Sequence, residues 1–476
     1  MTTMATDQGT PAPSTIWLTD RSRFKLGTSR CARARYLGYH FGPTGYGITA
    51  RRESLPLVTG ISVHQGLEAY TRILAEHDRL PDVGETRGIV HGICNAYLNR
   101  VEGRGFRGIL SGPQTDETIN EQVALISGLL WALRLKFLPW LHAAYQVRAI
   151  EEERLHFLSC SCGAPPLDTA EHIRRSCAGK ALMIRTDLLA QRRGGQTFAY
   201  LECKTTGWDS DAWAEQWETD AQLALGTLDV EAKYGHEVTE LYIIGLNKGG
   251  RKRDRYNPDD IRRQQSALCY GYRRPGNPPL AKDDWLPAYE WTDNEGETRR
   301  ASRAHKRTGI WLLDESDWPT WRAYQGSDPS LGAYEFWVRN LPASILDRVC
   351  FILGPMNRQD QQLRALTTSM AGEESRWQAH LWELYELQAN GYAWSSPEFQ
   401  EALDLRIPCS WACRPFGKDH QCEFVPVCHR HQGWDDPVGS GQYQPRLPHH
   451  DPELRQAIDR GLLPKEAAEA EEEDER

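Results

Sequence analysis

Apolar residues recur along this chain at two spacings, and each spacing predicts a different kind of element. Intervals of three and four residues predict helices over 60–76 and 118–144, the second with the longer stripe: Ile119, Val123, Ile126, Leu130, Leu133, Phe137 and Leu141. Apolar runs bounded by turn residues predict strands over 147–157, 181–190, 198–206 and 237–246. A further helix is predicted over 211–234. This order of elements is typical of an α/β fold.

The rest of the chain divides by composition. Residues 1–20 are polar and rich in Thr and Pro at their start, which predicts a disordered N-terminus. The α/β core is expected over 21–246, with a cysteine-rich insert at 159–177. Residues 247–400 are predicted to form a large, mostly helical insertion, with helices over 321–340 and 359–390. A cysteine-bearing segment over 401–435 and an extension over 436–476 follow.

Negative charge is concentrated in the last residues. The net charge is −9, and residues 465–476 hold seven acids and two bases, which predicts a disordered acidic tail and leaves −4 on the other residues. No apolar run is long enough to span a bilayer, and no N-terminal apolar segment is typical of a secretory signal. We therefore expect a cytoplasmic protein with no membrane partner. In that compartment, twelve cysteines favour metal or cluster ligation over disulfides.

Three polar residues on two neighbouring predicted strands form the strongest candidate site. Asp187 lies in the run 181–190, and Glu202 and Lys204 lie in the run 198–206. Turn residues at 192–196 predict a hairpin that brings Asp187 beside the other two, which share one face because strand side chains alternate. Two carboxylates and an ammonium suit a hard divalent cation and the activation of a water molecule. An exposed strand face with one salt bridge is the alternative.

The cysteine-rich insert has the ligands of a structural zinc site. Three cysteines and one histidine lie within it: Cys160, Cys162, His172 and Cys177. The insert has little apolar content, so a bound metal would supply the order that packing cannot. Three thiolates and one imidazole suit tetrahedral zinc. Three free thiols in a loop are the alternative.

Four more cysteines lie within twenty residues near the C-terminus: Cys409, Cys413, Cys422 and Cys428. This density predicts a bound soft metal or an iron–sulfur cluster. A closed zinc site made by all four is the simplest arrangement. The alternative is a cluster that uses three of them and takes its fourth ligand from elsewhere in the chain.

Taken together, Asp187 and the sequence Glu202-Cys203-Lys204 resemble the PD-(D/E)XK nuclease superfamily. One N-terminal cysteine with three C-terminal ones resembles its iron–sulfur branch, which includes RecB-like exonucleases, the AddB nuclease domain and CRISPR-adaptation exonucleases, with phage-type relatives looking most similar. Three shorter matches add to this resemblance. Ser29-Arg-Cys31-Ala-Arg-Ala-Arg-Tyr36 resembles the first cluster-ligand segment of that branch, Gly60-Ile-Ser-Val-His64 resembles its metal-binding histidine motif, and Gln222 resembles its glutamine motif. The resemblance as a whole covers residues 29–246 and 409–428.

The resemblance implies a restriction-endonuclease-like core, which is a mixed sheet flanked by helices. It also implies site residues that bind Mg²⁺ or Mn²⁺: His64, Asp187, Glu202 and the carbonyl of Cys203. Lys204 would orient or deprotonate the attacking water, or neutralise developing charge, with Gln222 as a further catalytic residue. A [4Fe-4S] cluster would be held by Cys31, Cys413, Cys422 and Cys428, with Cys409 as an alternative to Cys413.

The sequence departs from the family pattern at two positions. Thr186 stands where the family name has proline, and Gly226 stands where the glutamine motif usually ends in tyrosine. Both departures weaken the assignment of Gln222 as a functional residue more than they weaken that of Asp187, Glu202 and Lys204. Glu68, one helical turn after His64, is expected either to hold the His64 ring in place or to be a surface acid.

These features predict a metal-dependent DNA nuclease. We expect an exonuclease acting on single-stranded DNA or DNA ends in phage or host recombination, repair or processing. Basic runs at 248–263 and 299–307 suit contact with phosphates. One alternative is a catalytically weak DNA-binding subunit of a recombination or CRISPR-adaptation complex. The other is a zinc-stabilised nucleic-acid-binding protein without hydrolytic activity.

Overall fold

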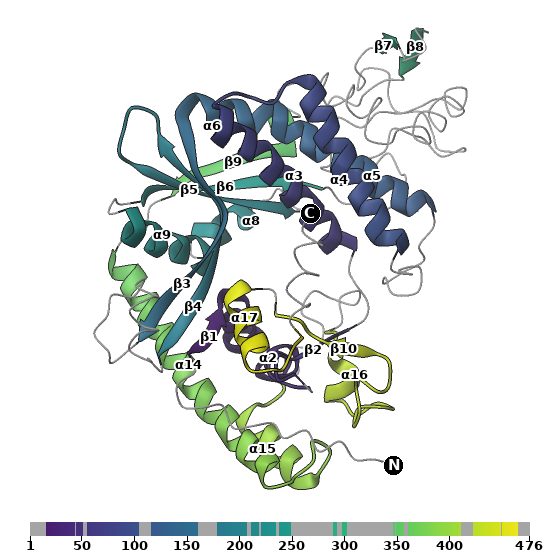
Figure 1. The fold of residues 1–476 in the computed structure, drawn as a ribbon, viewed down its shortest axis with the longest axis vertical. Coiled ribbons are helices and arrows are strands. Elements are labelled where there is room, and N and C mark those ends of the chain that lie inside the picture. Colours follow the sequence, from purple (N-terminus) through teal and green to yellow (C-terminus); the bar gives the residue numbers. More distant parts are fainter. Residues whose placement is uncertain are drawn as a thin grey trace.

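The computed structural model describes residues 16–42, 44–50, 55–103, 116–159, 179–206, 211–218, 220–234, 238–248, 289–292, 298–301, 346–347, 349–356, 360–410, 422–448 and 450–464. They form a mixed six-stranded sheet flanked by helices, and a second, mainly helical part (Figure 1). The second part is built from segments near both ends of the sequence. The predicted mixed α/β fold is therefore confirmed at this level.

The sheet has the strand order β1, β4, β5, β6, β9, with β3 paired to β4 outside that path. Its strands are β1 (Trp17–Asp20), β3 (Tyr145–Ser159), β4 (Lys180–Arg192), β5 (Phe198–Thr206), β6 (Val238–Asn247) and β9 (Cys350–Met356). β3, β4 and β5 pair antiparallel in chain order, whereas β5 and β6 are parallel. A parallel pair needs a crossover, which α9 (Ala221–Tyr234) supplies. A separate hairpin joins β7 (Tyr289–Thr292) and β8 (Thr298–Ala301).

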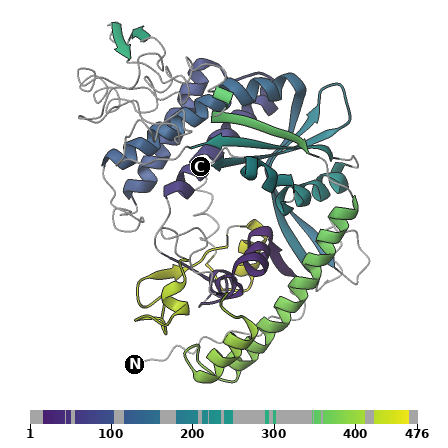
Figure 2. The same ribbon diagram turned by 180° about the vertical axis from the view of Figure 1, so that it is seen from behind.

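Alternating side chains of β5 divide between two cores, one on each face of the sheet. Leu201 and Cys203 lie in the core of one group of helices: α3 (Leu55–His77), α4 (Val83–Gly103), α5 (Asp116–Ala132), η3 (Leu133–Phe137) and α6 (Leu138–Ala144). Tyr200 lies in the opposite core with α9 and η4 (Gln216–Glu218), which follows α8 (Asp211–Glu215). The sheet is thus covered by helices on both faces (Figures 1 and 2).

The second part joins the two ends of the sequence around one apolar core. Its elements are α1 (Arg21–Lys25), η1 (Leu26–Arg30), α2 (Ala32–Tyr39), the hairpin of β2 (Ile48–Ala50) and β10 (Tyr443–Pro445), α14 (Asp360–Ala389), α15 (Pro397–Arg406), α16 (Val425–Cys428) and α17 (Asp451–Asp459). Tyr36 and Leu37 of α2 share this core with Leu381 of α14, Phe399 of α15 and Val427 of α16. The long helix α14 reaches from the sheet to this core (Figure 1).

Most predicted elements are confirmed to within a few residues, because their apolar patterns are strong. The predicted helix over 118–144 is found as α5, η3 and α6 in direct succession. The π-helical turn η3 precedes Pro139 in the first turn of α6, where proline has no N–H to donate to the preceding turn. The predicted helix over 321–340 lies outside the described residues.

Two predicted boundaries are wrong. Trp17–Asp20 was expected in a disordered segment but forms β1, because this short run pairs in parallel with β4 and Asp20 then accepts the Arg23 N–H as the cap of α1. The predicted insertion 247–400 was expected to lie apart from the core, yet its apolar run Cys350–Met356 pairs antiparallel with β6. Within the described ranges, no helix combines the length and hydropathy needed to cross a bilayer.

Candidate metal centre

The predicted site lies where β4 and β5 separate. Their pairing ends at Leu188 and Leu201, one residue away from Asp187 and Glu202. Beyond that point the Cys203 N–H donates to the side chain of Asp187 on β4, at 2.8 Å to Oδ2. This hydrogen bond from the backbone orients the Asp187 carboxylate at the edge of the sheet.

Helix α3 brings His64 to this edge. The stripe predicted from sequence, which includes Val63 and Leu67, is buried against the sheet and holds the helix in place. Gly60 permits the close approach, since a Cβ there would lie 3.3 Å from the Thr205 hydroxyl of β5. His64 Nδ1 is consequently 3.8 Å from Asp187 Oδ2, which confirms that these two predicted residues are neighbours.

A second carboxylate at the site, Glu151 of β3, was not predicted. Its Oε1 also lies 3.8 Å from His64 Nδ1, and ligand atoms of His64, Glu151 and Asp187 all lie within 4.8 Å of one another. The β3–β4 register pairs Ile150 with Leu188, so Glu151 falls opposite Asp187. Arg185 Nε donates to the other Glu151 oxygen at 2.9 Å and orients the carboxylate.

The backbone of Glu151 has an unusual conformation. Its φ of +47° lies in the left-handed region, which costs a residue other than glycine about 1–3 kcal/mol. Such conformations cluster at functional sites, where surrounding structure maintains them. Here the strain coincides with the position whose side chain joins the metal-ligand group, which supports a functional assignment for Glu151.

Glu202 and Lys204 form an ion pair beside this group. Lys204 Nζ donates to Glu202 Oε1, and the Tyr200 hydroxyl donates to Glu202 Oε2 at 2.8 Å. Glu202 is fully buried, whereas the side chain of Lys204 keeps 27% of its exposure. The prediction that these two side chains share a face is confirmed. The ligand atoms that lie within 4.8 Å of one another include one from Glu151 and none from Glu202, so the predicted contact of Glu202 with a metal stays a prediction.

The charges of the site act on one another. Burial and the nearby Asp187 carboxylate raise the pKa of Glu202, although Lys204 and Tyr200 oppose this. Burial alone would lower the pKa of Lys204 and of His64, but the carboxylates outweigh it and raise both. Lys204 is therefore a stable ammonium at neutral pH, which suits neutralising negative charge better than accepting a proton.

This donor set fits a hard divalent cation. Two carboxylates and one imidazole provide oxygen and nitrogen ligands, which suit Mg²⁺ and especially Mn²⁺. The site also has outer partners of the kind that orient metal ligands, since Arg185 bonds Glu151 and a backbone N–H bonds Asp187. The residues present therefore fit the predicted metal.

Other predicted site residues fare differently. Glu68 bonds Arg72 at 2.5 Å instead of orienting His64, because the two lie one turn apart on an exposed face of α3. Gln222 lies on α9, and its side chain is outside the described part. Cys203 supplies its N–H to Asp187, and the predicted carbonyl contact with a metal stays a prediction. The zinc-ligand candidates all lie outside the described residues: Cys160, Cys162, His172 and Cys177.

The predicted cluster segment brings cysteines together from both ends of the sequence. Cys31 precedes α2 and packs, with Cys422 and Cys428, against the core of the second part. Burial raises the pKa of the Cys428 thiol, and the neighbouring Cys409, Cys422 and Cys31 raise it further. Cys413 lies outside the described residues. Among the cysteines described, no three sulfurs lie within 4.8 Å of one another, although ligands of one zinc would lie about 3.8 Å apart.

The surroundings of Cys31 lower the pKa of its thiol. Burial would raise its pKa, but the Ser410 backbone and side chain, together with N–H groups of the first turn of α2, lower it. The start of a helix favours negative charge for the same reason. Ser410 directly follows Cys409, so Cys31 and Cys409 are neighbours.

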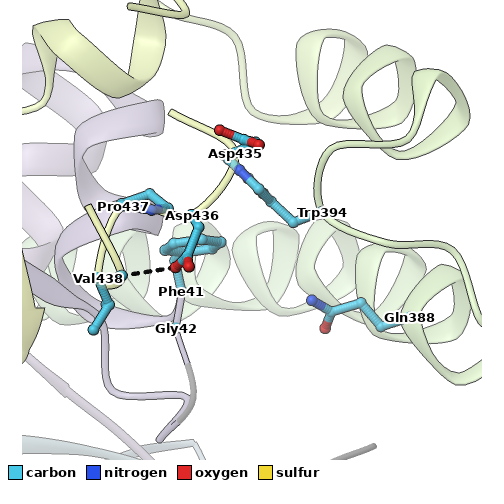
Figure 3. Close-up of a pocket in the computed structure, with 9 residues that line it drawn as sticks. Phe41, Gly42, Gln388, Trp394, Asp435, Asp436, Pro437 and Val438 are labelled. Carbon is cyan, nitrogen blue, oxygen red and sulfur yellow. Dashed lines mark hydrogen bonds between the residues drawn. The ribbon is translucent and has the colours of Figure 1, made fainter. Parts of the chain in front are cut away.

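A cavity of about 370 Å³ lies between the end of α14 and the turn at 435–439 (Figure 3). Phe41 and Trp394 form its aromatic wall, with Asp435 and Asp436 near its rim. The Asp436 carboxylate accepts the Gly439 N–H at 2.8 Å and so closes its own turn. This cavity contains none of the predicted site residues.

No protein-family model matches the chain, and no curated protein matches it. The functional assignment therefore rests on the residues of the site and on the sequence resemblance described above.

Proposed function

We propose that this protein is a metal-dependent DNA nuclease that hydrolyses phosphodiester bonds. The observation that carries the proposal is the convergence of His64, Glu151 and Asp187 beside the ammonium of Lys204. A bound Mg²⁺ or Mn²⁺ would lower the pKa of a water molecule and screen the charge of a phosphodiester. The chain's own groups hold the ligands in position, and Lys204 places a positive charge where negative charge develops.

The choice of DNA as substrate rests on the sequence resemblance and on charge. Most residues of the two predicted basic runs lie outside the described part of the chain. Of those described, Lys248 directly follows β6, and Arg299 and Arg300 lie in β8. Single-stranded DNA or DNA ends remain the proposed substrates. Recombination, repair or DNA processing is the proposed setting, in which a recombination or CRISPR-adaptation complex would supply protein partners.

The test is digestion of end-labelled single- and double-stranded DNA with and without Mn²⁺. Cleavage is expected with Mn²⁺ and should stop when EDTA removes the metal. Asp187→Asn is the matched control, because it removes one ligand charge and exposes any contaminating nuclease. DNA binding without cleavage would instead support the catalytically weak subunit, and failure both to bind and to cleave would contradict both functions.

Glu151→Gln is expected to weaken Mn²⁺ binding by at least about tenfold. Loss of outer partners of a metal typically costs about 10–100-fold in affinity or activity, and a direct ligand should cost no less. Titration of the protein with Mn²⁺, followed by the electron paramagnetic resonance signal of free Mn²⁺, measures the change. Glu68→Gln is the control, since Glu68 bonds Arg72 on the exposed face of the same helix that carries His64. Equal affinity in Glu151→Gln and the unsubstituted protein would remove Glu151 from the site.

We also propose that Cys31, Cys422 and Cys428 hold a [4Fe-4S] cluster. What supports the cluster is that Cys31, from near the start of the sequence, packs against the same core as Cys422 and Cys428, the combination that the resemblance implies for its ligands. Cys409 and Cys413 remain the candidates for the fourth ligand. The position of Cys409 beside Ser410, which bonds Cys31, supports Cys409. One zinc per chain, in addition to iron, is expected from the insert at 159–177.

Cys31→Ser is expected to remove the cluster. Anaerobically purified protein should contain about four irons per chain and absorb near 400 nm, and the variant should lose most of both. Comparing Cys409→Ser with Cys413→Ser identifies the fourth ligand as the one whose loss has the same effect. Cys94→Ala, in the buried core between α4 and α5, should keep its iron. A colourless, iron-free parent protein would contradict the cluster.

A further inference from the structure

Glu202 is the only carboxylate of the candidate site that is fully buried, and its two oxygens are held from different directions. Lys204 bonds one oxygen and the Tyr200 hydroxyl bonds the other at 2.8 Å. Tyr200 is itself completely buried on the same face of β5, two residues before Glu202. The orientation of the Glu202 carboxylate therefore depends on where the Tyr200 ring lies.

The Tyr200 ring is in turn fixed by a glycine on the crossover helix. A Cβ built on Gly226 of α9 would lie 2.3 Å from Tyr200 Cε2 and 2.4 Å from Cζ, closer than real Cβ contacts occur. No larger residue fits at 226 without moving the ring. This contact gives a steric reason for the absence of tyrosine at 226, which the sequence resemblance left unexplained. Leu223 and Val230 of the same helix share the core that encloses the ring.

The Tyr200 hydroxyl donates its hydrogen bond to Glu202 Oε2 at 2.8 Å. Burial raises its pKa well above the ordinary range, and the charges of Glu202, Asp187 and Glu151 raise it further. The Tyr200 hydroxyl therefore lies close enough to all three carboxylates for their charges to act on it. The hydrogen bond from Tyr200 holds Glu202 Oε2, while Oε1 accepts from Lys204.

We propose that Tyr200, set by its contact with Gly226, is the positioning residue that orients Glu202 and, through it, Lys204 at the metal centre. The effect that we expect of Tyr200 on DNA cleavage rests on the proposed nuclease function. The effect that we expect on Mn²⁺ affinity can be measured without DNA. Tyr200 does not touch the reacting atoms, and its contribution is to limit the orientations open to a buried carboxylate.

The test is Tyr200→Phe, which keeps the ring and removes the hydroxyl. We expect about a 10–100-fold loss of Mn²⁺ affinity, as for other outer partners of a metal site, together with a lower kcat for DNA cleavage and an unchanged KM for DNA. Tyr242→Phe is the matched control. Tyr242 is also a buried tyrosine on the neighbouring strand β6, and its hydroxyl pairs with that of Tyr145 at 3.0 Å, in the opposite core.

Gly226→Ala provides a second route to the same perturbation, because its methyl group displaces the ring from the helix side. It should shift Mn²⁺ affinity in the same direction as Tyr200→Phe. If both variants bind Mn²⁺ and cleave DNA like the parent protein, the positioning assignment is overturned. If the parent binds Mn²⁺ but cleaves no DNA, the proposed function fails, while the Mn²⁺ titrations still decide the assignment of Tyr200. A stability loss equal to that of Tyr242→Phe, with normal Mn²⁺ affinity, would also overturn it.

Discussion

Lys204→Ala is expected to lower Mn²⁺-dependent DNA cleavage by about 10²–10³-fold, the usual effect of removing one preorganised charge-stabilising group. Lys204 is held as an ammonium by Glu202 and Asp187, beside the ligand group. Its partial exposure allows it to reach a bound phosphate, whereas Glu202 beneath it cannot move freely. The initial rate of cleavage at saturating Mn²⁺ measures the effect.

The variant should remain folded, for a reason that the site provides. Without Lys204, burial and the charge of Asp187 would favour the protonated form of Glu202, so no isolated buried charge is left. The Tyr200 hydrogen bond to Glu202 also remains. Lys136→Ala is the control, because Lys136 is an exposed lysine that pairs with Asp347 far from the site residues in sequence. Cleavage by Lys204→Ala at the parent rate would contradict the role of Lys204.

The sequence was sufficient to predict Asp187, Glu202 and Lys204 as neighbours, because a short hairpin leaves little choice of register. The apolar runs on β4 and β5 determine which residues face the cores, and the polar residues between them are then placed by alternation. The approach of His64 depended on the resemblance rather than on periodicity, since one histidine on an amphipathic helix carries little information by itself.

Glu151 was not predicted because its position depends on long-range register. It lies in a run of three glutamates, Glu151 to Glu153, and alternation alone does not show which of them faces the site. The β3–β4 ladder contains an irregularity between Val147 and Ala149, and the backbone turns at Glu151 itself. The signal available in the sequence was an acidic run inside a predicted strand next to the strand of Asp187.

β1 and β9 were missed for a different reason. Each is short, and its stability comes from pairing with a longer strand that is distant in the sequence. β1 pairs with β4 across more than 150 residues, and β9 lies beyond a long segment that has no strong periodicity. A local sequence pattern does not predict pairing between distant segments, so β1 and β9 were identified only from the structure.

The second large effect is expected at a buried ion pair between the two ends of the sequence. Arg35 of α2 donates to Glu374 of α14 at 2.6 Å, and both side chains are almost completely buried. Trp17 of β1 donates to the same carboxylate oxygen at 3.0 Å, and the Arg35 guanidinium lies 4.4 Å from the centre of the Trp377 ring. These contacts attach β1 and the helix after Cys31 to α14.

Arg35→Ala is expected to lower the free energy of unfolding by about 3–5 kcal/mol, because it leaves the Glu374 charge buried without its partner. Urea denaturation followed by tryptophan fluorescence measures the change. Arg376→Ala is the matched control on the same helix. Its guanidinium pairs with Glu373 but is 68% exposed, so its loss should cost no more than about 1 kcal/mol.

A double variant separates the cost of an unpaired charge from the loss of packing. Arg35→Met with Glu374→Leu replaces both charges by apolar groups, and such replacements are often neutral or stabilising. The double variant should therefore recover most of the stability that either single substitution loses. If it is as unstable as Arg35→Ala, the pair acts through packing against Trp377 and the hydrogen bond from Trp17 rather than through charge. Because this pair lies next to the segment that carries Cys31, loss of iron in Arg35→Ala should follow its loss of stability, with the double variant regaining both.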